Sequence, residues 1–171
     1  MSMKNWVIFC VVLLVQVAVM AYVLGVGAEH FTYYLVVVVF TVLSYVDIKN
    51  RIVPDASHFV IVLLSVTNWD YVGIMDRLAG VFAVSLPIFG IAVLTKGFGG
   101  GDIKLFASLG FLFGWAFVVH VAFFAVVVSA VFAVGLIVMG KSRKTEIPFV
   151  PFIHVGFLVA CLTDLGGMFL F

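Results

Sequence analysis

The long apolar runs in this sequence constrain its fold more than any other feature. The run over residues 6–26 is about 20 residues long, enough for a helix to cross the hydrocarbon core of a bilayer. Of the 171 residues, 65% are hydrophobic and 10% are charged, whereas a soluble domain is about half apolar and about one quarter charged. A soluble domain of this size has too much surface for its volume to bury so many apolar side chains. We therefore expect an all-α, polytopic membrane protein.

The apolar runs and the charged breaks between them predict a transmembrane helical bundle of six or seven segments. The number depends on how the short stretches after Pro54 and Asp102 are counted. Pro87 is expected to kink its segment, because proline frees a backbone carbonyl. The sequence has no internal repeat and no linker, so we expect residues 1–171 to form a single membrane-embedded domain. In chain order, the predicted segments are residues 6–26, 31–46, 56–69, 75–95, 103–113, 116–139 and 147–171.

The distribution of basic residues predicts how these segments are oriented. If the stretch after Asp102 is a full crossing, eight of the nine Lys and Arg residues fall on one side of the membrane, and only Arg77 falls on the other. Basic residues concentrate in the cytoplasmic loops of membrane proteins. We therefore expect the N-terminus and the loops at residues 47–55 and 96–102 to face the cytoplasm. The net charge of +1 gives no electrostatic reason to expect nucleic acid as a partner.

Two of the eight acidic residues, Asp47 and Asp102, lie at the predicted cytoplasmic ends of apolar segments. Two carboxylates about 3 Å apart cannot both ionise, so they share a proton. One of them can then activate water as a base while the other protonates a carbonyl oxygen, which is the chemistry of aspartic peptide hydrolysis. The two cysteines are far apart and the four histidines are scattered, so we expect neither a metal site nor a cofactor.

Three consecutive glycines, residues 99–101, directly precede Asp102. Glycine can adopt a positive φ and allows another backbone to approach closely. The three can therefore admit a substrate strand beside the acid or let a helix start tightly at Asp102. A flexible turn is the alternative, and Asp102 can also serve only as the N-cap of the next helix. Lys49, Arg51 and Lys104 can bias the protonation of the acids or anchor helix ends at lipid headgroups.

Taken together, these residues resemble the motifs of the type IV prepilin peptidases, a family of bacterial and archaeal membrane aspartic peptidases. Residues 99–104 (Gly-Gly-Gly-Asp-Ile-Lys) resemble the GxGD motif of that family and the lysine that follows it. Residues 47–54 (Asp-Ile-Lys-Asn-Arg-Ile-Val-Pro) resemble its first-aspartate motif. Residues 147–151 (Ile-Pro-Phe-Val-Pro) resemble a third patch that contains two prolines. The resemblance covers residues 31–160, most of the chain.

The resemblance implies roles for individual residues. Asp47 and Asp102 would be the catalytic pair, Gly99 and Gly101 would shape the loop, and Lys104 would support it.

The first-aspartate motif adds Arg51 and Pro54 as supporting residues. Two positions depart from the family pattern. Asp55 stands where members often have asparagine, which puts a third carboxylate near the pair. Val150 stands where glycine is common, so we assign no role to the third patch.

The resemblance also implies partners and a location. The substrates would be prepilins or pseudopilins with a basic leader and an apolar helix, cleaved without a cofactor at the cytoplasmic face of a prokaryotic inner membrane. Larger members carry a cysteine-bearing cytoplasmic region associated with N-methylation. The first two predicted segments here are joined by a short turn, so the chain is similar to the short members, including those of tight-adherence (Flp pilus) systems. We expect a peptidase without methyltransferase activity.

Two other functions fit the same sequence. One is a GxGD peptidase of the preflagellin or presenilin type, which would act on a different substrate. The other is a small transporter or assembly scaffold whose two acids bind a cation or a proton.

Overall fold

The computed structural model of this chain describes residues 3–27, 30–95, 99–140 and 147–163. The described residues form α-helices and a short 3-10 helix, with no strand among them, which confirms the predicted all-α fold. The loop charges Lys96, Lys141, Arg143 and Lys144, and also Glu29, Glu146 and Asp164, lie outside the described residues. The elements are α1 (Met3–Leu24), α2 (Phe31–Asn50), α3 (Asp55–Leu64), η2 (Ser65–Asn68), α4 (Ile74–Ala83), α5 (Ser85–Thr95), α6 (Gly100–Phe113), α7 (Trp115–Val138) and α8 (Val150–Thr163).

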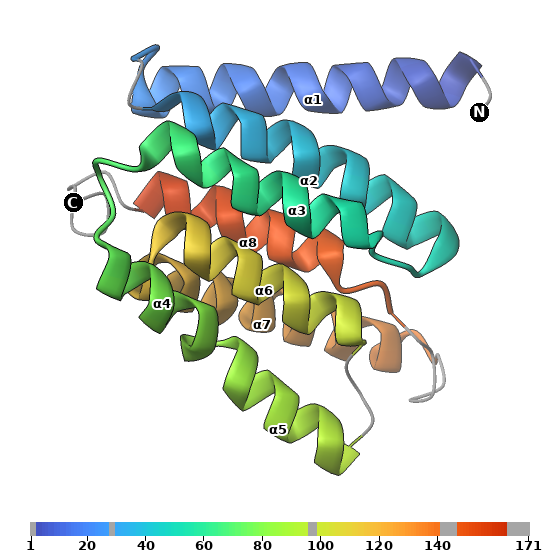
Figure 1. Cartoon of the computed structure of the whole chain (residues 1–171). Helices are drawn as coiled ribbons and strands as arrows, with labels where there is room; N and C mark the ends of the chain where they lie inside the picture. Colours follow the sequence, from blue (N-terminus) through green and yellow to red (C-terminus); the bar gives the residue numbers. More distant parts are fainter. Residues whose placement is uncertain (1–2, 28–29, 96–98, 141–146, 164–171) are drawn as a thin grey trace.

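The helices run back and forth between the two ends of one bundle (Figure 1). At the right of the figure α2, α5 and α7 end, and α3, α6 and α8 begin. With α3 and η2 counted as one pass, and α4 and α5 as another, the described residues make seven passes. The larger of the two predicted numbers of segments is therefore the observed one.

Four of these passes are long and apolar enough to cross a membrane, namely α1, α2, α4 with α5, and α7. Only 6% of the apolar window of α1 and 11% of that of α7 are buried, compared with 44% for α2. Helices with so much exposed apolar surface need a lipid environment. The protein is therefore a multi-pass membrane protein in which α2 is central and α1 peripheral.

The end of α2 differs from the prediction. The helix continues to Asn50 instead of ending at residue 46, so Asp47 is helical and does not lie in a loop. The polar residues that suggested a loop suit the last turn of a helix, where the exposed carbonyls favour a basic side chain such as Lys49. Arg51 ends the helix with a left-handed φ of 55°, and its N–H donates to the Asp47 carbonyl at 2.8 Å.

Proline and glycine mark two further helix boundaries. Pro87 is the third residue of α5, and its ring would clash with the carbonyl four residues earlier, that of Ala83, where α4 ends. The predicted kink is therefore a break between two helices. Gly114 separates α6 from α7 with a φ of 84°, a conformation that glycine adopts without strain.

An aromatic cluster joins α2, α6, α7 and α8 in the core. The rings of Tyr33 and Phe113 lie 4.8 Å apart between centroids, those of Phe113 and Phe117 lie 4.9 Å apart, and Phe157 packs against all three. This cluster fixes the relative positions of the helices whose ends carry the candidate site.

Glycines bring α4 close to α6. A Cβ added to Gly80 or to Gly110 would overlap the backbone of the other residue, so the two helices cross at these positions. Small residues allow such close packing between membrane helices. The contact holds α6, the helix that carries Asp102 at its start, against α4.

Candidate active site

Asp47 lies in the last turn of α2 and its side chain meets the start of α8. The carboxylate is only 6% exposed. Its Oδ2 accepts a hydrogen bond from the backbone N–H of Val150 at 3.0 Å, and the backbone N–H of Phe149 donates to the same group. A helix N-terminus has free N–H groups and a partial positive charge, which together stabilise an anion. The start of α8 thus provides donors for a carboxylate that is buried away from water.

The proline-containing patch positions these donors. Phe149 caps α8, because its carbonyl accepts the N–H groups of Phe152 and Ile153 at 3.0 and 3.2 Å. Pro151 fits in the first turn of the helix, where a backbone N–H has no partner inside the helix. Sequence reasoning assigned no role to this patch, although two prolines before an apolar run are a signal for a helix start. Valine at position 150 keeps the N–H that binds Asp47.

Asp102 lies in the first turn of α6, after the N-cap residue Gly99. Its backbone N–H donates to the Gly99 carbonyl at 3.2 Å. Its carboxylate in turn accepts the backbone N–H of Gly99. The second bond is one half of a capping box, in which the third helical residue reaches back to the N–H of the cap; the other half is absent because glycine has no side chain. Asp102 therefore stabilises the start of α6 without being its N-cap, which corrects that alternative.

The two acids interact electrostatically. Burial, and then the negative charge of Asp47, raise the pKa of Asp102 to about 6, while the hydrogen bond from Gly99 opposes this shift. α2 packs against α3 and α8, and α3 packs against α6, so neighbouring helices hold the two acids at one end of the bundle. A carboxyl group whose pKa is raised by burial and by a second carboxylate has the properties of a general acid.

The glycines before Asp102 differ from the prediction in their conformation. Gly99 has an extended backbone with a φ of −74°, and Gly100 and Gly101 are the first residues of α6, so none of the three has a positive φ. The helix also begins before Asp102. The expected close approach does occur at Gly101, where an added Cβ would lie 2.9 Å from the Cβ of Val53. The neighbour at Gly101 is thus the loop after α2, part of this chain and not a substrate.

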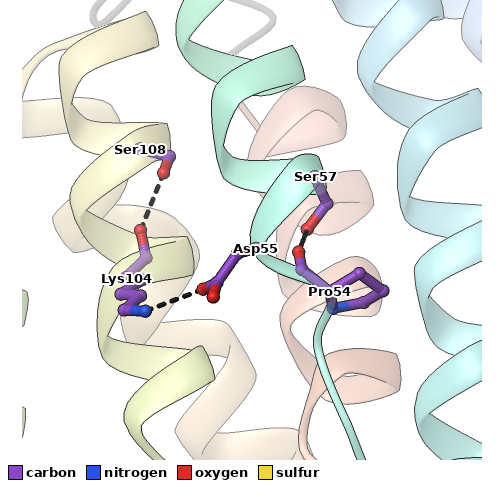
Figure 2. Close-up of polar contacts among 5 residues, drawn as sticks. All are labelled: Pro54, Asp55, Ser57, Lys104 and Ser108. Carbon is purple, nitrogen blue, oxygen red and sulfur yellow. Dashed lines mark hydrogen bonds and ion pairs between the residues drawn. The ribbon is translucent and has the colours of Figure 1, made fainter.

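Lys104 links the start of α6 to the start of α3. Its Nζ lies 2.7 Å from Asp55 Oδ1, and the two exposed side chains form an ion pair (Figure 2). The hydrogen bond and charge of Lys104 hold the pKa of Asp55 below its usual value. Lys104 therefore neutralises the third carboxylate that the sequence places near the pair.

Pro54 caps α3 in an extended conformation, with a ψ of 134°. Its carbonyl accepts the Ser57 hydroxyl at 2.6 Å, as Figure 2 shows, and the Ser57 N–H at 3.0 Å. Arg51 and Pro54 thus set the two ends of the short connection from α2 to α3, and Val53 between them contacts Gly101.

Arg77 was not predicted to have a structural role. It was counted among the charges on the far side of the membrane, at the start of the predicted segment 75–95, but its side chain is fully buried in α4. Its guanidinium donates to the carbonyls of Phe111 and Leu112 at 2.9 and 3.2 Å, and to both oxygens of Asn68. The last carbonyls of α6 are thus satisfied by Arg77. The guanidinium also lies over the ring of Trp69, 5.0 Å from its centroid. The available sequence signal was an arginine within the apolar segment 75–95, where a charge indicates a specific role.

Within the described part of the chain, no three His, Cys, Asp or Glu side chains lie close enough together to hold a metal ion. Cys10 is exposed and Cys161 is buried, and neither forms a disulfide.

Residues 34–134 match the type IV leader peptidase family. A prepilin leader peptidase/N-methyltransferase of Bacillus subtilis (strain 168) is 32% identical over 132 residues, covering 75% of this chain and 52% of that protein. A protein of the same name from Aeromonas salmonicida (strain A449) is 29% identical over 134 residues, covering 72% and 46%. Prepilin peptidase EppA of Methanococcus maripaludis is 38% identical over 73 residues, covering 41% and 19%. The chain spans about half the length of the first two relatives. No solved structure matches it.

Proposed function

Because the chain belongs to the type IV leader peptidase family, we propose that it is a membrane aspartic endopeptidase. It removes the basic leader from prepilins or pseudopilins at the cytoplasmic membrane face, using Asp47 and Asp102. The names of the relatives support the substrate class. The observation that carries the proposal is the position of the two acids at one end of the bundle, Asp47 in the last turn of α2 and Asp102 in the first turn of α6, where the charge of Asp47 helps to raise the pKa of Asp102.

The environments of the two acids suggest how they divide the reaction. Asp102, with its raised pKa, holds the proton, and Asp47 is the carboxylate held by backbone donors. Asp47 takes a proton from water as the oxygen attacks the scissile carbonyl carbon, and Asp102 gives its proton to the carbonyl oxygen. When the tetrahedral intermediate collapses and the C–N bond breaks, the nitrogen takes the proton from Asp47. The hydroxyl proton returns to Asp102, which restores the starting state.

The proposed cytoplasmic orientation is supported by the charges of the described residues. Lys49, Arg51 and Lys104 lie at the end of the bundle that carries the two acids. Arg77, the basic residue counted on the opposite side, is fully buried and bound to backbone carbonyls. A buried arginine does not contribute to the charge of a loop, so the asymmetry between the two ends is greater than the sequence alone indicates.

The test is to incubate a purified prepilin with the purified enzyme in detergent and to follow leader removal by gel shift. We expect Asp47→Asn and Asp102→Asn each to lose at least about 10³-fold in kcat/KM. Asp70→Asn, an exposed acid beyond η2, is the matched control and should retain activity. Undiminished cleavage by either site variant would falsify the pair. Cleavage in detergent, where no ion gradient exists, also excludes a transporter as the source of the activity.

A further inference from the structure

A cavity of about 390 Å³ lies between α1, α2 and α8, beside the proposed site. Polar side chains line part of it, although these helices are mostly apolar. Polar groups at membrane depth are costly, so their presence indicates a function. The lining residues of the cavity are Ile8, Phe9, Val12, Gln16, Thr41, Ser44, Tyr45, Ile48 and His154.

His154 is the most informative of these residues. Its side chain is 5% exposed, with Phe40 stacked on the ring at 5.5 Å between centroids. Nδ1 lies 3.2 Å from the Ser44 hydroxyl oxygen, whereas Nε2 is buried without a protein partner. Buried polar atoms are nearly always hydrogen-bonded. A lone buried nitrogen beside a cavity therefore points to a ligand that supplies the missing partner.

A second polar group faces the cavity from α1. The Thr41 hydroxyl lies 2.9 Å from Gln16 Oε1 and so joins α1 to α2. The amide nitrogen of Gln16 keeps two donors for another group. Gln16, Ser44 and His154 together offer hydrogen-bond donors and acceptors from three helices.

The cavity lies directly below the proposed active site. Ser44 precedes Asp47 by one helical turn on α2, and His154 follows Val150, the backbone donor to Asp47, by one turn on α8. The cavity also opens to the outside, because the lining residues Ile8 and Ile48 are 62% and 61% exposed. A molecule in the bilayer can thus reach it from the side.

We propose that this cavity binds the first turns of the apolar helix of the substrate, which enters from the bilayer between α1 and α2. This inference rests on the proposed peptidase function. The first N–H groups of any helix have no partner inside it, and a chain extended for cleavage also frees carbonyls. In lipid these groups have no water to bind, so they need protein partners. Ser44 and His154 supply them one helical turn from the proposed site, and Gln16, which bonds Thr41, lies about one turn further into the membrane.

Two experiments on the full-length protein test the site. In the first, a photo-crosslinking amino acid replaces Val12 in the Asp102→Asn background, which retains uncleaved prepilin. Val15 on the same helix is 57% exposed and does not line the cavity, so it is the matched control. We expect a crosslink to the prepilin from position 12 and not from position 15. Equal crosslinking from both positions, or crosslinking of position 12 to lipid alone in the presence of prepilin, overturns the proposal.

The second experiment measures cleavage by Gln16→Leu and by the control Val15→Leu. We expect KM to rise about tenfold in Gln16→Leu with kcat unchanged, since a hydrogen bond to the bound helix is lost. An unchanged KM together with active wild-type enzyme overturns the docking site and leaves the peptidase function standing. Failure of the peptidase function itself would instead appear as no cleavage by the wild-type protein.

Discussion

At the scale of single residues, the carboxyl group of Asp102 determines how the protein should respond to pH. Its pKa rises from 3.8 to about 6 because the side chain is buried and lies near the charge of Asp47. Two consequences follow, one for the reaction and one for folding. Both depend on the fact that the native structure favours the protonated form.

The first consequence is a limit on activity at alkaline pH. If Asp102 is the acid, kcat/KM should fall as pH rises, with an apparent pKa near 6 that belongs to the pair in the free enzyme. The fall of kcat should occur at a higher pH than the fall of kcat/KM, because bound substrate excludes more water from the carboxyl group of Asp102. Initial rates of leader cleavage between pH 4.5 and 9 measure both limbs. A profile of kcat/KM that stays flat from about pH 5 to 8 contradicts this assignment.

The second consequence concerns stability. Because the pKa of Asp102 is higher in the folded than in the unfolded state, ionising Asp102 lowers the free energy of unfolding. This loss is absent below about pH 4, grows as pH rises and is complete above about pH 6. Asp102→Asn removes the charge and keeps an acceptor for Gly99. We expect this variant to be more stable than wild type at pH 7.5 by on the order of 2 kcal/mol, and equally stable at pH 4. Thermal unfolding in detergent at the two pH values is the measurement. An equal gain in stability of Asp102→Asn at pH 4 and at pH 7.5 would show that the charge of Asp102 is not the cause.

At the scale of helices, the site depends on contacts between the starts and ends of neighbouring elements. The loop after α2 touches α6 where Val53 meets Gly101, and the ion pair of Lys104 with Asp55 adds a second link. An exposed ion pair contributes little to stability, because water and salt screen the two charges. The steric contact at Gly101 is therefore the stronger constraint on how close α6 lies to the loop.

This contact predicts different outcomes for two neighbouring glycines. Gly101→Ala places a Cβ 2.9 Å from Val53, so the loop or α6 must shift, and a misplacement of about 1 Å can cost about 10²-fold in rate. At Gly100 an added Cβ meets nothing within 4 Å, so Gly100→Ala should keep its activity. Measured kcat/KM values for prepilin cleavage compare the two. Similar activity in both variants would mean that the Gly101 contact does not position Asp102.

Much at this scale could be predicted from the sequence. The ends of apolar runs placed both acids near helix ends, and Pro87 and Gly114 marked real breaks, because each has a local backbone cause. The donors to Asp47 could not be predicted, since they are backbone N–H groups of Phe149 and Val150 whose position depends on how α8 packs against α2. The early start of α6 was missed for a different reason. The hydrogen bond from the Gly99 N–H to the Asp102 carboxylate outweighs the low helix propensity of glycine.

At the scale of the whole molecule, the two ends of the bundle have different chemistry. One end carries both acids and the exposed Lys104, and the other carries the buried cluster of Arg77 and Asn68. Sequence reasoning counted Arg77 as a loop charge, because nothing local shows that the carbonyls of another helix will surround it. The buried guanidinium of Arg77 binds the carbonyls of Phe111 and Leu112 and so holds the end of α6 in place.

The orientation of the bundle can be tested by cysteine labelling in cells. Cys10 and Cys161 are first replaced by serine and alanine, and a single cysteine is introduced at exposed Lys49 or exposed Asp70. A membrane-impermeant maleimide should label Asp70→Cys in cells with a permeable outer envelope. It should label Lys49→Cys only after the inner membrane is opened, because that end faces the cytoplasm. The opposite pattern would reverse the proposed topology.

The bond between Asp47 and Val150 joins residues that are 103 positions apart in the chain. During synthesis α2 enters the membrane long before α8 exists, so Asp47 stays without these donors until α8 has been made. Because the donors to Asp47 come from α8, the cost of burying this carboxylate is relieved only once α8 packs against α2. A nascent or truncated chain that lacks α8 would therefore hold Asp47 and Asp102 without the two backbone donors to Asp47.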